Sequence, residues 1–176
     1  MNGHSPSTRF RDFYNGKRVL VTGGAGFIGS HLVDELASLG ARVKVLDNLS
    51  TGTRRNLASS FSRIQLIAGD VASKECLSRL GEIEVVFHDA ALSLLQSFYA
   101  PISNCLTNVV GTLNILELVR KMDARMVFAS TGSIYGSIPD YICNEETPRS
   151  PITLYFGPSA VKVVMPERPL GTVCEV

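Results

Sequence analysis

The chain has 176 residues, of which 45% are hydrophobic and 19% charged, with 17 basic and 16 acidic side chains. This make-up is typical of a soluble, single-domain globular protein, and the balanced charge excludes the basic field that holds nucleic acid. No stretch approaches the roughly 20 apolar residues that cross a bilayer, and the polar N-terminus lacks a signal peptide's apolar segment, so we expect a cytoplasmic protein without nucleic-acid or membrane partners.

The first structured elements are expected directly after a polar leader, residues 1–16. Residues 17–23 form a short β-branched run that ends in glycine, which predicts a buried parallel strand. Residues 27–39 carry apolar side chains at helical spacing, and Gly40 supplies the stop. The sequence therefore opens with a strand and a helix joined by a glycine-rich turn.

The same alternation continues along the chain. A long amphipathic helix is predicted over residues 101–121, and four further strands over residues 43–46, 64–67, 85–87 and 125–128. Strands separated by helical segments imply right-handed crossovers and a parallel sheet covered on both faces. We therefore predict an α/β fold of the Rossmann type, a doubly wound sheet spanning residues 17–155.

The last segment, residues 156–176, follows a different pattern. Pro158, Pro166 and Pro169 prevent a long helix there, and we expect an atypical tail without a domain of its own. The four cysteines, Cys76, Cys105, Cys143 and Cys174, are widely spaced and contain no Cys-x-x-Cys pair, so we expect thiols in a reducing compartment and no metal site.

The strongest functional signal is the segment Thr22-Gly-Gly-Ala-Gly-Phe-Ile-Gly29, between the first strand and the first helix. Gly23 permits a tight turn, Gly26 lets the backbone approach a pyrophosphate, and Gly29 lets helix and strand pack closely. The helix N-terminus would face the phosphates. An ordinary strand-to-helix turn is the alternative, but the strand and helix on either side favour dinucleotide binding.

An acidic residue stands about 20 residues after this loop. Asp47 ends the second predicted strand, where a carboxylate accepts hydrogen bonds from the adenosine ribose and repels a 2′-phosphate. This favours NAD over NADP. Arg54 and Arg55 lie nearby and keep NADP open as an alternative, although a solvated helix face explains them as well.

Taken together, the motifs resemble those of the extended short-chain dehydrogenase/reductases, particularly the NAD-dependent epimerase/dehydratase group that includes UDP-galactose 4-epimerase. The resemblance covers residues 17 to about 155, with landmarks in the family's order. They are Thr22–Gly29, Leu46-Asp-Asn-Leu-Ser-Thr-Gly52, Gly69-Asp-Val71, His88-Asp-Ala-Ala91, Asn108-Val-Val-Gly-Thr112 and Phe128-Ala-Ser-Thr-Gly-Ser-Ile-Tyr-Gly136.

The resemblance implies roles for individual residues around a bound NAD. His88 and His31 are interpreted as structural, and Asn108 is either a supporting residue of the site or a helix-packing amide. The implied contacts are Phe27 and Ile28 beside the pyrophosphate, Asp47 and Asn48 at the adenosine ribose, Asp70 and Val71 at the adenine, and Ala90, Ala91 and Leu92 along the middle of the cofactor.

The family's chemistry uses a hydroxyl, a tyrosine as acid/base and a lysine four residues later. The lysine lowers the pKa of the tyrosine, because a nearby ammonium favours the phenolate. By resemblance Thr131 is the hydroxyl and Tyr155 the tyrosine, but the lysine position is Ser159, or Ala160 if Phe156 is aligned instead. The sequence thus departs from the family here, and the family's last strands and substrate domain are not expected.

Three functions stay open from the sequence. The first is an NAD-dependent enzyme that acts on a nucleotide-linked sugar by transient oxidation, with a homodimer left open. The second is a non-catalytic dinucleotide-binding module, and the third is a truncated, inactive family member. A reading-frame shift after Tyr155 is a further hypothesis, since another frame of the codons for residues 161–176 can encode a helix-forming sequence.

Overall fold

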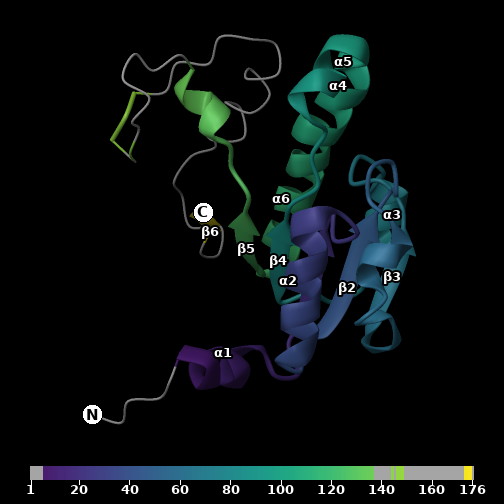
Figure 1. Cartoon of the computed structure of the whole chain (residues 1–176), viewed down its shortest axis with the longest axis vertical. Coiled ribbons are helices and arrows are strands. Elements are labelled where there is room, and N and C mark those ends of the chain that lie inside the picture. Colours follow the sequence, from purple (N-terminus) through teal and green to yellow (C-terminus); the bar gives the residue numbers. More distant parts are fainter. Residues whose placement is uncertain (1–5, 137–143, 145, 149–172, 176) are drawn as a thin grey trace.

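A computed structural model describes residues 6–136, 144, 146–148 and 173–175 of the chain. Its centre is a six-stranded parallel sheet in the order β3-β2-β1-β4-β5-β6 (Figure 1). The strands are β1 (Arg18–Thr22), β2 (Arg42–Asp47), β3 (Ile64–Ala68), β4 (Val85–His88), β5 (Arg125–Phe128) and β6 (Val173–Glu175). The order reverses beside β1, which is the arrangement predicted for a doubly wound sheet.

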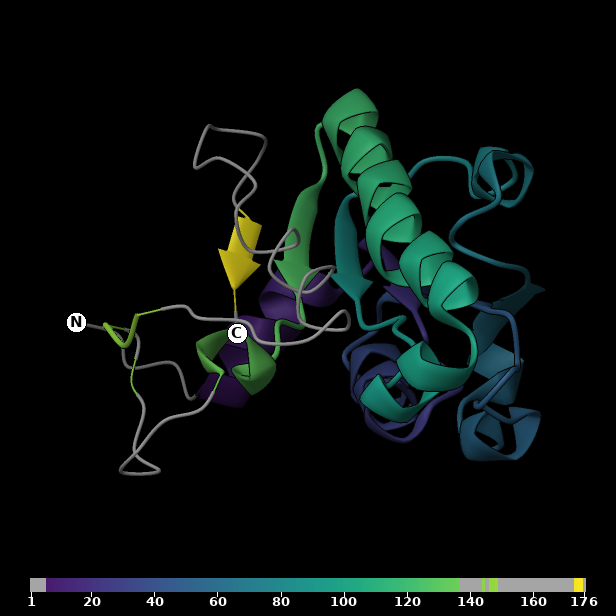
Figure 2. The same cartoon turned by 90° about the horizontal axis from the view of Figure 1, so that it is seen from above.

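Helices follow β1, β3 and β4 and lie on both sides of the sheet (Figure 2). The α-helices are α1 (Pro6–Tyr14), α2 (Phe27–Ser38), α3 (Lys74–Ser78), α4 (Leu94–Tyr99), α5 (Pro101–Cys105) and α6 (Thr112–Met122). Short 3₁₀ segments are η1 (Arg54–Leu57), η2 (Phe61–Arg63) and η4 (Gly132–Tyr135), and η3 (Leu106–Gly111) is a π-helical segment between α5 and α6.

Two hydrophobic cores explain why the strands are apolar on both faces. On one face Val33 and Leu36 of α2 pack with Val19, Val21 and Val45 of the sheet. On the other face, Ile115, Leu118 and Val119 of α6 form a second core. They pack with Leu20, Val86 and Met126 of the sheet. Burial on both faces is what a parallel sheet requires, so the near-continuous β-branched runs were an accurate signal.

Some elements differ from the sequence expectations. The leader contains α1, and Phe13 and Tyr14 at its end pack against the sheet, with the Arg125 guanidinium 5.3 Å from the Phe13 ring centroid. In the segment 156–176, residues Val173–Glu175 pair with β5 as a sixth strand, whereas the sequence predicted five. The long helix is correct in extent but is interrupted by the π-helical segment η3.

The expectation that no stretch approaches membrane-spanning length also needs correction. The continuous helical run Pro101–Met122 is 22 residues long with a mean hydropathy of 1.3, enough to cross a membrane by length and composition alone. It is weak evidence for a span, because Ile115, Leu118 and Val119 form part of the core and Asn104, Asn108 and Asn114 are buried polar residues on the same run.

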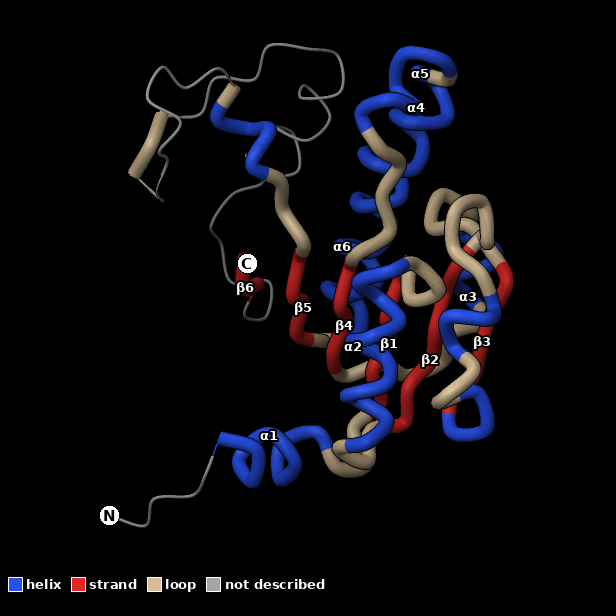
Figure 3. Tube along the Cα trace, viewed as in Figure 1, coloured by secondary structure: helices blue, strands red, loops and turns tan. Residues whose placement is uncertain are grey.

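The loops that follow the strands set the position of the site. The parallel strands β4 and β5 pair in register, Val85 with Arg125 and His88 with Phe128. The chain segments that follow these two strands leave the sheet at the same edge (Figure 3). The carboxyl ends of parallel strands therefore gather there, as in other open α/β sheets, where ligands bind outside this edge.

Candidate functional site

A pocket of about 330 Å³ lies at the carboxyl edge of the sheet. Its lining brings together eleven of the residues that the sequence predicted for cofactor binding: Gly23, Gly26, Phe27, Ile28, Asp47, Asn48, Asp70, Val71, Ala90, Ala91 and Leu92. It also includes Leu46, Ser50, Thr51, Gly69, Asp89 and Thr107, which the sequence reasoning had not assigned. Most of these six adjoin assigned residues within the family landmarks, which is the signal that identifies them.

The glycine loop explains why this pocket can bring backbone close to a ligand. Gly23 has φ +72°, and a Cβ there would lie 2.8 Å from the backbone nitrogen of Ala90. Gly29 does not line the pocket among the described residues, but a Cβ on it would lie 2.4 Å from the Gly23 carbonyl oxygen. Gly23 therefore provides the turn and Gly29 the close helix–strand contact, as the motif predicts.

The first turn of α2 faces the pocket through its backbone. Gly26 is the N-cap, and within the described residues no side chain caps the helix. The next two side chains, Phe27 and Ile28, are 79% and 68% exposed while their residues line the pocket. An uncapped 12-residue helix leaves N–H groups and the positive end of its dipole directed at this space, which suits a phosphate.

Asp47 has a structural role in addition to the one predicted. Its side chain is buried, and Oδ2 accepts a hydrogen bond of 2.9 Å from the backbone N–H of Ala25, inside the glycine loop. Oδ1 accepts a second bond from the Leu49 N–H at 2.8 Å. Each carboxylate oxygen has a second lone pair, so both oxygens remain able to accept from a ribose hydroxyl.

Asn48 and Asp70 meet across the pocket rim. The Asn48 Nδ2 donates to Asp70 Oδ2 at 2.9 Å, and Asp70 Oδ1 accepts from the Ala72 N–H at 2.8 Å. This pair joins the loops after β2 and β3, where the adenine half of a dinucleotide was expected. Arg54 and Arg55 lie in η1 and are exposed, and within the described chain they do not line the pocket.

Asn108 supports the pocket from behind. It is buried in η3, its Oδ1 accepts from the Leu92 N–H at 2.9 Å, and its Nδ2 donates to the Leu92 carbonyl at 3.0 Å. Asn104 adds bonds from its Nδ2 to the carbonyls of Leu92 and Ser93. These bonds hold Leu92 of the pocket lining, while Asn108 itself does not line the pocket within the described residues. Its role at the site stays a prediction.

The two histidines, which the sequence analysis interpreted as structural, lie in different surroundings: His88 is buried and His31 is exposed. His88, at the end of β4, is 2% exposed; its Nδ1 lies 2.7 Å from Thr22 Oγ1, and its ring stacks on Phe128 with 5.7 Å between centroids. His31 makes an edge contact with the Phe27 ring at 5.2 Å. Neither residue lines the pocket within the described part of the chain.

The predicted catalytic residues are placed only in part. Thr131 follows β5 at the carboxyl edge, three residues after Phe128, and is half-buried. Among the described residues it does not line the pocket. Tyr155, together with the candidate lysine positions, lies outside the described residues.

Comparison with known proteins gives consistent results. The family model described as GDP-mannose 4,6 dehydratase matches residues 20–163. The chain is 43% identical over 122 residues to UDP-glucuronic acid decarboxylase 1 of Arabidopsis thaliana, covering 68% of this chain and 27% of the relative. It is 40% identical over 143 residues to a putative UDP-glucose 4-epimerase of Methanocaldococcus jannaschii, covering 78% of this chain and 46% of the relative.

A solved structure extends the similarity to three dimensions. The UDP-glucose 4-epimerase of Thermus thermophilus, in complex with NAD, is 39% identical and superposes with a TM-score of 0.74. The match covers 82% of this chain and 48% of that structure. The chain thus spans about half the length, or less, of these relatives.

Proposed function

The chain belongs to the GDP-mannose 4,6-dehydratase family of NAD-dependent sugar-nucleotide epimerases and dehydratases, and from this premise we propose that its sheet binds NAD for chemistry on a nucleotide-linked sugar. The observation that carries the proposal is the pocket in which the glycine loop, the uncapped start of α2 and Asp47 converge.

The residues present fit a dinucleotide. Gly23 and Gly26 keep the pocket free of side-chain atoms where a Cβ would meet backbone at 2.8 and 3.1 Å, so a pyrophosphate can approach the main chain. The Asp47 carboxylate and the Asn48–Asp70 pair supply acceptors and donors for the ribose and adenine. Bound NAD would supply a hydride acceptor for transient oxidation of the sugar.

The roles of the chain's own residues follow from their places. The α2 N-terminus would hold the pyrophosphate, Asp47 the adenosine ribose, and Asp70 with Val71 the adenine. Ala90, Ala91 and Leu92 would orient the middle of the cofactor. By resemblance, Thr131 takes the position of the hydroxyl that donates to the sugar, and Tyr155 that of the acid/base tyrosine, without the lysine that lowers the pKa of the tyrosine.

Titration calorimetry with NAD and NADP tests the cofactor proposal directly. We expect NAD to bind more tightly, because a carboxylate at position 47 repels a 2′-phosphate. Equal or tighter binding of NADP would overturn the role of Asp47. Binding of neither cofactor would overturn the proposal for this chain and favour the inactive family member.

We also propose a homodimer in the cytoplasm. Five large apolar side chains are exposed together on α4, α5 and η3, although charged or polar residues usually cover such helices. These residues, the apolar helix face, are Leu95, Phe98, Tyr99, Ile102 and Leu106, with exposed fractions between 47% and 88%. We propose that a second copy of the chain covers this face, because a two-fold dimer buries the same apolar patch of both copies. We propose in addition that the chain is divided into a leader (residues 1–16), a cofactor-binding domain (residues 17–155) and a tail (residues 156–176).

A further inference from the structure

A line of buried hydrogen bonds runs behind the pocket, from the end of β1 through the end of β4 to the long helix. The Ala90 N–H donates to Thr22 Oγ1 at 3.3 Å, and Thr22 Oγ1 lies 2.7 Å from His88 Nδ1. On the other side of the ring, His88 Nε2 lies 3.0 Å from Thr112 Oγ1, which donates to the Asn108 carbonyl at 2.8 Å. We call Thr22, His88, Thr112 and Asn108 the His88 network.

Donors and acceptors can be assigned along the network, because each hydroxyl has a single proton to donate. Thr112 donates its proton to the Asn108 carbonyl, which can only accept, so Thr112 Oγ1 must accept from His88 Nε2–H. The Ala90 N–H occupies one lone pair of Thr22 Oγ1, and within the network the Thr22 proton has an acceptor only when His88 Nδ1 is unprotonated. Every bond is made when the imidazole is neutral and carries its proton on Nε2.

An imidazolium would disturb this order. It would present a second donor, Nδ1–H, to the Thr22 oxygen that already accepts from Ala90, and the Thr22 proton would lose Nδ1 as its acceptor. Thr22, His88 and Thr112 are each at most 3% exposed, so water cannot readily replace a missing partner. Stacking of the ring on Phe128 fixes its plane from β5.

Both ends of the network reach the same loop. Thr22 holds Ala90 through its N–H, and Asn108 holds Leu92 through both its N–H and its carbonyl. The His88 network is therefore hydrogen-bonded to the loop 89–92 at both of its ends, and all four loop residues line the pocket. Asn104, Asn108 and Thr112 are spaced four residues apart. An α-helix turns once in about 3.6 residues, so side chains at this spacing shift progressively around its axis. The wider π-helical turn offsets this shift and keeps the three side chains on one face.

We propose that His88, held as the neutral Nε2–H tautomer between Thr22 and Thr112, is a positioning residue that fixes the pocket loop 89–92 for the cofactor. This inference rests on the proposed function for its ligand, NAD. The tautomer and the order of the loop are properties of the chain without ligand. They can be tested even if no cofactor binds.

The first experiment is ¹⁵N nuclear magnetic resonance of the imidazoles in the intact chain at neutral pH. The sequence has three histidines, and the spectrum of His88→Gln assigns the signal of His88. We expect one protonated and one unprotonated ring nitrogen, with the coupling pattern of the Nε2–H tautomer. A signal of the Nδ1–H tautomer, of the imidazolium, or of a rapidly exchanging mixture would overturn the proposal.

The second experiment separates positioning from general stability. Thr112→Val removes the hydroxyl but preserves its shape, Thr112→Ser restores the hydroxyl, and Ile115→Val removes a methyl group from the same helix outside the network. We expect Thr112→Val to speed amide exchange of Ala90 and Leu92 and to weaken NADH binding about tenfold. Thr112→Ser and Ile115→Val should stay within about twofold of the wild type in both measurements.

The outcomes distinguish the two proposals. If Thr112→Val leaves the amide exchange of Ala90 and Leu92 unchanged, or if Ile115→Val alters it equally, the positioning role of His88 is wrong. If the wild type binds no cofactor while its amide exchange and its tautomer behave as expected, the network stands and the proposed function fails.

Discussion

The carboxylate of Asp47 accepts a hydrogen bond of 2.9 Å from the backbone N–H of Ala25, which ties the end of β2 to the glycine loop 22 residues earlier. The side chain predicted to bind the ribose is therefore also bonded to the turn that is predicted to hold the phosphates. A single substitution at this position is expected to alter both properties.

We predict that Asp47→Asn weakens NAD binding and reduces the preference for NAD over NADP. An amide keeps one acceptor oxygen but presents its NH₂ to a backbone donor, Ala25 or Leu49. Loss of one buried hydrogen bond to a charged group costs about 1.5–3 kcal/mol, so we expect a drop in NAD affinity of roughly tenfold or more. Calorimetry with both cofactors measures it.

The matched control is Asp34→Asn, which changes a carboxylate on α2 that bonds to Ser59 and not to the pocket. It should leave the ratio of NAD to NADP affinity unchanged. An unchanged ratio in Asp47→Asn as well would remove position 47 from cofactor discrimination.

A second prediction concerns the packing of α2 against the glycine loop. In Gly29→Ala the new methyl group would lie 2.4 Å from the Gly23 carbonyl oxygen and 2.8 Å from the Gly24 Cα, so backbone must move. We expect a loss of about 1–3 kcal/mol in the free energy of unfolding and weaker NADH binding. Thermal unfolding and fluorescence titration measure the two effects.

Gly132→Ala is the comparison, because a Cβ there meets nothing within 4 Å in the described structure. It should unfold within about 0.5 kcal/mol of the wild type. If the two glycine variants have the same stability, the helix is not packed against the loop as described.

The strands were predictable from sequence because parallel strands buried on both faces need continuous apolar runs. Strand bounds for β1 to β5 agree within a residue or two with those expected, and α2 and the extent of the long helix agree as well. The glycine spacing also placed the pocket correctly. At these positions the residue types that local sequence patterns favour are also the types that packing in the fold requires.

Other features depend on contacts that the sequence does not display. The helix α1 is polar along most of its length and is held through Phe13 and Tyr14, whose partners lie on distant strands. Around the π-helical segment, Asn104 and Asn108 bond to the loop after β4 and Thr112 bonds to His88 at the end of β4, contacts that have no local signature in the sequence. The bond from the Ala25 N–H to Asp47 is likewise a tertiary contact that the sequence does not display.

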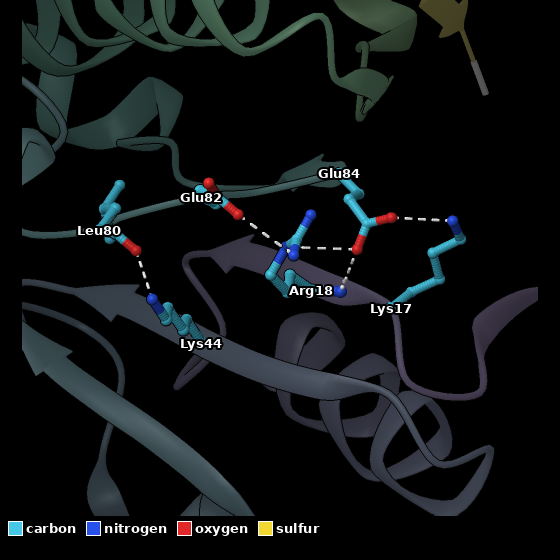
Figure 4. Close-up of polar contacts among 6 residues, drawn as sticks. All are labelled: Lys17, Arg18, Lys44, Leu80, Glu82 and Glu84. Atoms are coloured by element: carbon cyan, nitrogen blue, oxygen red, sulfur yellow. Dashed lines mark hydrogen bonds and ion pairs between the residues drawn. The ribbon is translucent and has the colours of Figure 1, made fainter.

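A third prediction concerns pH and the ion pairs at the opposite edge of the sheet (Figure 4). Glu84 accepts a 2.8 Å bond from the Lys17 ammonium and a 3.1 Å bond from the Arg18 N–H, and these bonds hold the pKa of Glu84 below its ordinary value. A lowered pKa contributes stability that is complete above the ordinary glutamate pKa and is lost as the pH falls through the lowered one.

We therefore expect Glu84→Gln to destabilise the protein by up to about 1 kcal/mol at neutral pH, since the pair is partly exposed, and by progressively less in acid. Urea unfolding at several pH values gives the difference. Glu82→Gln, whose carboxylate is 83% exposed beside Arg18, should change stability less. A Glu84→Gln penalty that is constant down to low pH would contradict the assignment.

A fourth prediction addresses the apolar helix face. Ile102→Glu places a charge where the side chain is 76% exposed, so it should leave the fold intact but disfavour burial against a second copy. Sedimentation velocity should show a dimer for the wild type and a monomer for the variant. Phe61→Glu, at a 49% exposed site on η2, should remain dimeric. A monomeric wild type at the same concentration would refute the homodimer.

The last prediction is that this chain does not turn over a nucleotide sugar, even where it binds NAD. Tyr155 has Ser159 where the family's spacing places lysine, and Ala160 takes that position in the other alignment. A phenol without a neighbouring ammonium keeps its proton at neutral pH almost completely, which costs roughly 4 kcal/mol of barrier if nothing compensates. The assay is epimerisation or dehydration of UDP- and dTDP-linked hexoses, followed by chromatography, with Tyr155→Phe alongside. Turnover that disappears in Tyr155→Phe would show the prediction wrong. If it also disappears in Lys162→Ala, Lys162 would be the ammonium that replaces the missing lysine.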